Sequence, residues 1–155
     1  PEIVFTQAEL DRLSYFHDVA RYRQREVPLY KRAQITVNDL ALTLGDHPLA
    51  RFDDLEQLTM LPDNLVPHVL RVDGVLVFDP ELVARIERVE DIASGSEPEV
   101  EIRAVGLHAV ELLVAELRAG GLDVAARDLD TFLWNRGAGR AYKAIPRHRT
   151  RCVFY

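Results

Sequence analysis

The longest helical pattern in the sequence lies between Ser96 and the Gly120-Gly121 pair. Ser96 and Glu99 have the spacing of a capping box, which starts a helix, and glycine commonly follows the last helical turn. Between these limits, apolar residues recur every three or four positions and form one stripe: Ile102, Val105, Ala109, Leu112, Leu113 and Leu117. Because such a stripe must be covered by other elements, the pattern predicts a central core helix around which the rest of the chain packs.

The other segments also carry the periodicity and end signals of helices. These patterns predict helices from Thr6 to before Pro28, Tyr30 to Leu44, Asp53 to about Met60, Asp63 to Gly74, Asp79-Pro80 to about Val89, and Asp123 to near Trp134. No segment has a convincing strand pattern. The sequence therefore predicts an all-α fold, a compact single domain over residues 1–155 with about seven helices.

Composition limits the class of protein further. The single cysteine, Cys152, excludes an internal disulfide, and neither a membrane-spanning apolar run nor a signal peptide is visible, so we expect a cytoplasmic protein. His108 and Glu111 stand three positions apart on the long helix, but no further residues complete a ligand set. The sequence accordingly predicts no metal site and no cofactor.

The basic residues of this chain are concentrated in two segments. The formal net charge is -6, which argues against stable binding to nucleic acid. Nevertheless, residues 21–32 contain five basic residues against one acid, and residues 136–155 contain six basic residues and no acid. If the fold brings the two segments together, they form a site for a small anion such as phosphate. If it does not, they are two solvated basic faces.

The stretch from Leu61 to Gly74 contains the first candidate for chemistry, Asp63. At the start of a short helix, its carboxylate can cap the first amides, and the helix dipole favours the ionised form. The position of Asp63 relative to the apolar residues of the helix is explained by this capping role alone. Lys31 lies in the first turn of its predicted helix, where a cation opposes the dipole, so a requirement other than helix stability can account for it.

The C-terminal segment combines arginines with an apolar end. It reads Pro146-Arg-His-Arg-Thr-Arg-Cys-Val-Phe-Tyr155. A disordered terminus rarely ends in Val-Phe-Tyr, so we expect the segment to dock onto the body and carry its arginines inward. Docked in this way, their guanidinium groups would be placed for bidentate capture of phosphate.

Four stretches together resemble one family, in order and in spacing. They are residues 30–35, 63–71, 99–111 and 129–134 with 148–151, which contain Tyr-Lys-Arg-Ala-Gln-Ile, Asp-Asn-Leu-Val-Pro-His-Val-Leu-Arg, Glu-Val-Glu-Ile-Arg-Ala with Ala-Val-Glu, and Leu-Asp-Thr-Phe-Leu-Trp with His-Arg-Thr-Arg. The chain resembles the C-terminal half of the queuosine salvage proteins, which act as queuosine 5′-phosphate N-glycosylases. The resemblance implies an all-helical fold similar to the helix-hairpin-helix DNA glycosylases.

By this resemblance, the substrate is queuosine 5′-monophosphate and the products are queuine and ribose 5-phosphate. Asp63 corresponds to the catalytic aspartate of the family and Lys31 to its active-site lysine. An ionised carboxylate against C1′ can stabilise the positive charge that builds on the ribose, or attack it. Lys31 can orient that carboxylate, protonate or hydrogen-bond the leaving base, or contact phosphate, and the sequence leaves these roles open.

The resemblance also suggests substrate-binding residues. We expect His148, Arg149 and Arg151 to bind the 5′-phosphate and Trp134 or Tyr30 to stack on the base, with Asn64 and His68 beside Asp63 in the substrate site. His68 stands where the family more often has glutamine. Family members are usually about twice as long as this chain, so a missing N-terminal half or a partner chain would complete the base pocket.

Two alternative functions remain at the level of the sequence. A lysine and an aspartate on a helical scaffold also suit a DNA base glycosylase of the helix-hairpin-helix type, although the acidic net charge disfavours a long duplex footprint. A non-enzymatic helical module that binds a nucleotide or phosphate would retain binding without releasing a base.

Overall fold

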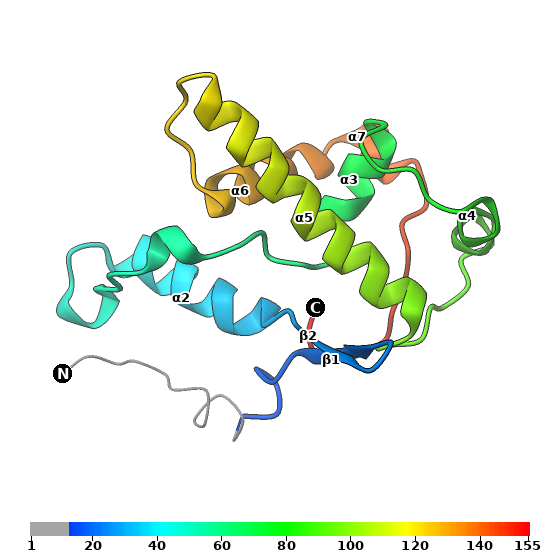
Figure 1. The fold of residues 1–155 in the computed structure, drawn as a ribbon, viewed down its shortest axis with the longest axis horizontal. Coiled ribbons are helices and arrows are strands. Elements are labelled where there is room, and N and C mark those ends of the chain that lie inside the picture. The colour runs from blue at the N-terminus through cyan, green and yellow to red at the C-terminus, as the bar shows by residue number, and fades with distance from the viewer. Residues whose placement is uncertain (1–12) are drawn as a thin grey trace.

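The computed structural model describes residues 13–155, apart from the side chain of Leu49. The described elements are β1 (Val19–Tyr22), β2 (Arg25–Pro28), α2 (Lys31–Leu44), the 3-10 helices η1 (Pro48–Ala50) and η2 (Leu55–Gln57), α3 (Val66–Val72), α4 (Pro80–Glu87), α5 (Glu97–Ala119), α6 (Ala126–Gly137) and α7 (Arg140–Lys143). The prediction of a mainly helical chain is confirmed (Figure 1). The prediction that the chain has no strand is wrong.

A β-hairpin replaces the C-terminal part of the helix predicted to start at Thr6, whose first residues lie outside the described part of the chain. β1 and β2 pair antiparallel, with Val19 opposite Pro28 and Tyr22 opposite Arg25. The two residues between the strands, Arg23 and Gln24, have φ values of 45° and 69°. A two-residue hairpin with positive φ at both central positions is a type I′ turn, for which Asn and Gly are preferred. Because neither Asn nor Gly is present at these two positions, the sequence does not predict the turn.

The core is built where α3 packs against α5 and α6 (Figure 1). Its buried apolar residues are Met60, Val66, Val69, Leu70, Val110, Val114, Ala126 and Leu133. Glycine allows the closest approaches: a Cβ at Gly106 of α5 would lie 2.8 Å from Pro67 Cγ, and one at Gly137 of α6 would lie 2.8 Å from Leu65 Cδ1. The start of α3, which follows Asp63, is therefore fixed against two longer helices.

The long helix α5 ends as predicted but buries only part of the predicted stripe: Ile102 is buried, and Ala109 and Leu113 pack against the core. Val105 is 49% exposed and Leu112 is 55% exposed. The buried positions of α5 are Glu99, Val100, Ile102, Arg103, Gly106, Val110 and Val114. This face includes two charged residues and a glycine, so an apolar pattern could not identify it. The predicted capping box is also absent, because the Ser96 hydroxyl donates to Ala93 O and Glu99 Oε2 accepts from Gly95 N.

The predicted starts of the shorter helices differ in accuracy. Asp79 caps α4 as expected, and its Oδ1 accepts from Glu81 N at 2.8 Å. α6 begins later than predicted and is capped by Asp128, which accepts from Ala125 N at 3.0 Å, so Asp123 is not its cap. The segment predicted as a helix from Asp53 contains only the short η2.

A buried charged cluster joins segments that are distant in the sequence. The Arg103 side chain is 2% exposed and forms ion pairs with Asp18 and Glu99, which are 2% and 1% exposed. Its Nη1 donates to Asp18 Oδ1 at 3.0 Å and to Glu99 Oε1 at 3.3 Å, and its Nε donates to Pro62 O at 2.7 Å. We call Asp18, Glu99 and Arg103 the buried triad. It connects the residue before β1 to α5 and to the loop before α3.

The C-terminal segment docks as predicted, but its arginines point outward. Ile92 N donates to Arg149 O at 2.7 Å, and the Tyr155 hydroxyl donates to Glu99 Oε1 at 2.8 Å. The side chains of Arg149 and Arg151 are 54% and 86% exposed and form ion pairs with Asp91 at 3.6 and 3.0 Å. The Tyr155 side chain therefore contacts the triad, while the guanidinium groups of Arg149 and Arg151 remain at the surface.

No helix in the described part of the chain combines the length and apolar character needed to cross a membrane.

Removing the Tyr155 hydroxyl tests this docking. Tyr155→Phe deprives the buried Glu99 of one donor, so we expect the free energy of unfolding to fall by about 1–3 kcal/mol. Tyr22→Phe is the matched control, because it removes a tyrosine–glutamate hydrogen bond to Glu101 at an exposed site. Urea unfolding of the two variants should show a clearly larger loss for Tyr155→Phe. Equal losses would contradict a structural role for the docked tyrosine.

Candidate active site

Asp63 lies immediately before α3 and is 8% exposed. Its Oδ1 accepts from Leu65 N at 2.7 Å and from Val66 N at 3.2 Å. The predicted interaction with the first amides of the helix is therefore confirmed. Both hydrogen bonds use the same oxygen, so the carboxylate is oriented by Oδ1 while Oδ2 takes no part in this cap.

Lys31 is the first residue of α2, and Asp18 fixes its backbone. Lys31 N donates to Asp18 Oδ2 at 3.2 Å, and the amides of Leu29 and Tyr30 both donate to Asp18 O, at 2.9 and 3.1 Å. The first turn of α2 contains no acidic residue of its own. Asp18 consequently supplies from another segment the carboxylate that helix N-termini favour. Tyr30, with φ of 47°, turns the chain into the helix.

Asp130 is a third charged residue of this region, and the sequence analysis did not select it. It lies on α6, is 4% exposed, and its Oδ1 accepts from Leu61 N at 3.0 Å. Burial raises the pKa of Asp130 to about 7, the Leu61 amide lowers it, the charge of Asp63 raises it and that of Lys31 lowers it. The fields of Asp63 and Lys31 thus act on one buried carboxyl. Lys31, Asp63 and Asp130 form what we call the carboxylate–lysine site.

The segment before α3 is bound to α6 through Asp130, and the buried carboxyl in this arrangement suits acid–base chemistry. A carboxyl group whose pKa is near neutrality can hold or release a proton at physiological pH. The carboxylate of Asp63, held by backbone amides, can face a developing positive charge. Asp130 occupies a buried position of α6 together with Ala126, Leu133 and Gly137. An acidic residue at a position that faces the core was the one signal in the sequence that could have identified Asp130.

Three of the predicted binding residues adjoin this site along the chain. Tyr30 precedes Lys31, and the half-buried Asn64 follows Asp63. Trp134 lies one helical turn after Asp130 on α6 and is 50% exposed. Residues four apart on a helix lie on the same side, so Trp134 projects near Asp130. The stacking of Trp134 on a base stays a prediction, and this position is compatible with it.

The two histidines predicted to bind substrate, His68 and His148, lie in the interior and not on a charged surface. His68 Nε2 is 3.0 Å from Tyr142 O, and burial lowers the pKa of His68. Burial, reinforced by the neighbouring His68 and by Arg103, Arg147 and Arg71, lowers the pKa of His148 to about 4. A neutral His148 contributes no positive charge to phosphate binding at neutral pH. Arg149 and Arg151 form ion pairs with Asp91, and their contact with the 5′-phosphate stays a prediction.

A metal centre has no support in the described residues. Within residues 13–155, no group of three His, Cys, Asp or Glu side chains is arranged to hold a metal ion.

These features describe a mainly helical protein with a site of two buried carboxyl groups and a half-buried lysine. Residues 6–155 match the model of the family described as queuosine salvage protein, and the chain belongs to this family. The resemblance stated from the sequence is thereby confirmed.

Several curated relatives share the name queuosine 5′-phosphate N-glycosylase/hydrolase. Those from Dictyostelium discoideum and Sphaerobacter thermophilus are 41% and 44% identical over 140 residues, which is 90% of this chain. The relative from Mus musculus is 31% identical over 158 residues and 96% of this chain. The matched region covers 44%, 43% and 47% of these three relatives. The chain therefore spans less than half the length of the curated relatives that it matches.

The pKa of Asp130 predicts a pH-dependent stability. Its folded-state pKa, about 7, lies above the usual value near 4, so the folded protein binds more protons between these two pH values. Stability is consequently lost as the pH rises through this window. Asp130→Asn keeps an acceptor for Leu61 N but has no charge to bury, so at pH 8 we expect a gain on the order of 2 kcal/mol that shrinks towards pH 4.

Urea unfolding at pH 4, 6 and 8 measures this difference. Asp123→Asn is the control, since Asp123 is an exposed carboxylate before the same helix. A gain that is constant with pH would show that the Asp130 carboxyl is not desolvated in the folded protein.

Proposed function

We propose that this chain provides the catalytic site of an N-glycosidase that hydrolyses queuosine 5′-monophosphate to queuine and ribose 5-phosphate. The observation that carries the proposal is the pair of buried carboxyls, with Asp63 held by the amides at the start of α3 and Asp130 bound to the amide of Leu61, two residues before Asp63. The charge of Lys31 acts on the same Asp130 carboxyl. The name shared by relatives up to 44% identical supports the choice of substrate. In this role the protein would act in queuine salvage for tRNA modification.

The proposed reaction breaks the bond between C1′ and the base nitrogen and forms a bond from C1′ to a water oxygen. Positive charge builds on the ribose as the base departs, and the Asp63 carboxylate would stabilise it or attack C1′. Its two amide donors hold the group in one orientation. The departing base takes up a proton, for which Asp130 and Lys31 are the nearest candidates in this site.

The same geometry favours particular residues for binding. Trp134, one turn from Asp130, and Tyr30, next to Lys31, are the candidates for stacking on the base, with Asn64 beside the catalytic carboxylate. Arg149 and Arg151 would have to leave Asp91 to reach a phosphate at this site. Lys31 is therefore the better-placed cation for the 5′-phosphate if it does not serve the base.

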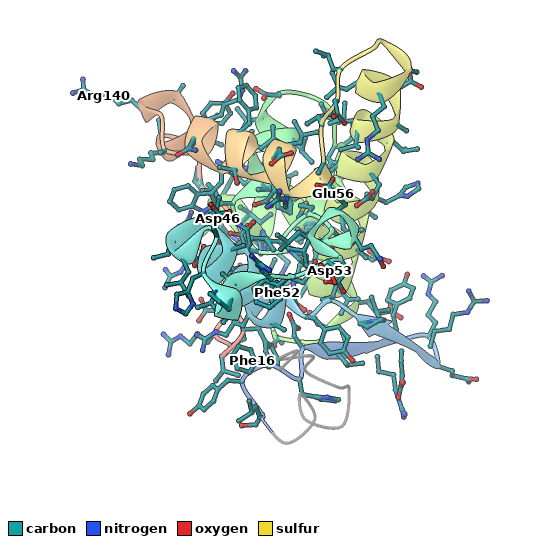
Figure 2. All side chains as sticks on the ribbon, turned by 90° about the vertical axis from the view of Figure 1, so that its left-hand side faces the viewer. Phe16, Asp46, Phe52, Asp53, Glu56 and Arg140 are labelled. Carbon is teal, nitrogen blue, oxygen red and sulfur yellow. The ribbon has the colours of Figure 1, made fainter. Side chains whose placement is uncertain are left out.

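The surface charge favours a small substrate over a nucleic acid. Figure 2 shows Asp46, Asp53 and Glu56 on the side of the molecule where α2 and the two 3-10 helices face the viewer. The net charge of the whole chain is -6, which disfavours binding of a polyanion. No observation in the described residues favours the DNA glycosylase alternative.

We further infer that the site is completed by additional chain, as the length of the relatives suggests. In α2, only Asn38 is fully buried, and Leu42 is 68% exposed. A helix so poorly covered fits a surface onto which another part of a full-length family member packs. That part would also supply the rest of the base pocket around Trp134.

Two aspartates that cap helices in the same way provide the test. The chain is incubated with queuosine 5′-monophosphate, and free queuine is followed by chromatography and mass spectrometry. We expect Asp63→Asn to lower base release by roughly 1,000-fold, because asparagine still caps but carries no charge. Asp79→Asn changes the equivalent cap of α4, at 2.8 Å from Glu81 N, and should leave release unchanged.

Full activity of Asp63→Asn would overturn the assignment of Asp63. Nucleotide binding without release by the unmodified chain would instead show that essential residues lie outside these 155 positions.

A further inference from the structure

We propose that Arg103 and Asp18 act as a positioning pair that fixes Lys31 relative to Asp63. The inference rests on the proposed function of the carboxylate–lysine site and extends it to two residues outside that site. Each partner of the pair holds one of the two catalytic segments, and a single guanidinium group joins them.

Asp18 holds the segment that carries Lys31. Its Oδ2 accepts from Lys31 N at 3.2 Å, and its backbone oxygen accepts from Leu29 N at 2.9 Å and Tyr30 N at 3.1 Å. Three consecutive amides at the entry to α2 therefore end on one residue. The position of this residue sets the position of the first helical turn and of the Lys31 Cα atom.

Arg103 holds the segment that carries Asp63. Its Nε donates at 2.7 Å to the carbonyl of Pro62, the residue immediately before Asp63. The preceding residue, Leu61, donates its amide to Asp130 at 3.0 Å. The chain at 61–63 is thus held by α5 through Arg103, by α6 through Asp130 and by α3 through the cap of Asp63.

The geometry of the guanidinium group explains why arginine occupies this position. Nη1 and Nη2 both contact Asp18 while Nε points to Pro62, so one planar group sets the spacing between the two segments. A lysine has a single nitrogen and cannot make this set of contacts. A buried ion pair adds little net stability compared with apolar packing, so fold stability alone does not require this arrangement.

The exposed fraction of Arg103 separates positioning from catalysis. At 2% exposure, its side chain is enclosed by Asp18, Glu99 and the ring of Tyr155, whose centroid lies 4.8 Å from Cζ. Within the described residues, its contacts are therefore protein groups, and we assign it no direct role in the chemical step.

Arg103→Lys and Asp18→Asn test the pair, with Arg118→Lys as the matched control. Arg118 lies on the same helix and also donates its Nε to a backbone carbonyl, that of Val124 at 2.8 Å, but at the other end of α5 (Figure 1). The first readout is amide hydrogen exchange. We expect exchange at Leu29, Tyr30 and Lys31 to rise at least about tenfold in both test variants, with Val110 in the core unchanged.

The second readout is kinetic and uses queuosine 5′-monophosphate. A displacement of about 1 Å between catalytic groups costs on the order of 100-fold in rate, so kcat should fall by about that factor while KM changes less than about threefold. Arg118→Lys should change neither quantity. If Arg103→Lys does not fold, Asp18→Asn decides the matter, since its asparagine occupies the same space.

The two readouts separate this inference from the proposed function. Absence of base release in the unmodified chain would count against the proposed function of this chain alone, while the exchange experiment would still decide whether the pair holds the segment. Unchanged protection at Leu29, Tyr30 and Lys31 in the folded variants would overturn the inference. An equal rise at Val110 would also overturn it, because that result indicates a general loss of stability.

Discussion

The buried guanidinium group of Arg103 is the contact on which the rest of this structure depends. Removing a charge from water is costly unless its hydrogen-bonding capacity is met by oriented partners. Here the partners are two carboxylates, Asp18 and Glu99, and the carbonyl of Pro62. These partners come from the entry to β1, from α5 and from the loop before α3. The hydrogen bonds of the Arg103 guanidinium group therefore determine how three segments meet.

The geometry of the candidate site is set by this cluster and by the helix packing beside it. Pro67 and Leu65 of the α3 region approach α5 and α6 at Gly106 and Gly137, where any side chain would collide. α3 therefore has one position between its neighbours, and Asp63 is fixed at its start. The site combines the Asp63 carboxylate, which backbone amides hold, with the Asp130 carboxyl, whose pKa is raised by burial to about 7. These are environments that separate the roles of two acids in catalysis.

Local sequence patterns predicted part of the local structure. The bounds of α2, the cap of α4 and the end of α5 follow from spacing and end residues, and Asp63 meets the first amides of α3 as expected. Interactions over long sequence separation were not predictable in this way. Neither the pairing of Asp18 with Arg103 nor the approach of Asp130 to Leu61 leaves a periodic pattern.

Two other differences have equally specific causes. The hairpin turn at Arg23 and Gln24 uses positive φ values without the residues that usually mark them. The C-terminal segment docks through backbone and aromatic groups, and the expectation that its arginines turn inward failed because Asp91 pairs with both at the surface.

The measurement that tests the central claim most directly is a carbon-13 NMR titration of the Asp130 carboxyl in Asp63→Asn and Lys31→Gln. If the three residues form one site, Asp63→Asn lowers the pKa of Asp130, because a neighbouring negative charge is removed, and Lys31→Gln raises it. Opposite shifts from the two substitutions are the predicted result. A pKa of Asp130 that is the same in both variants as in the unmodified chain would contradict the assembled site.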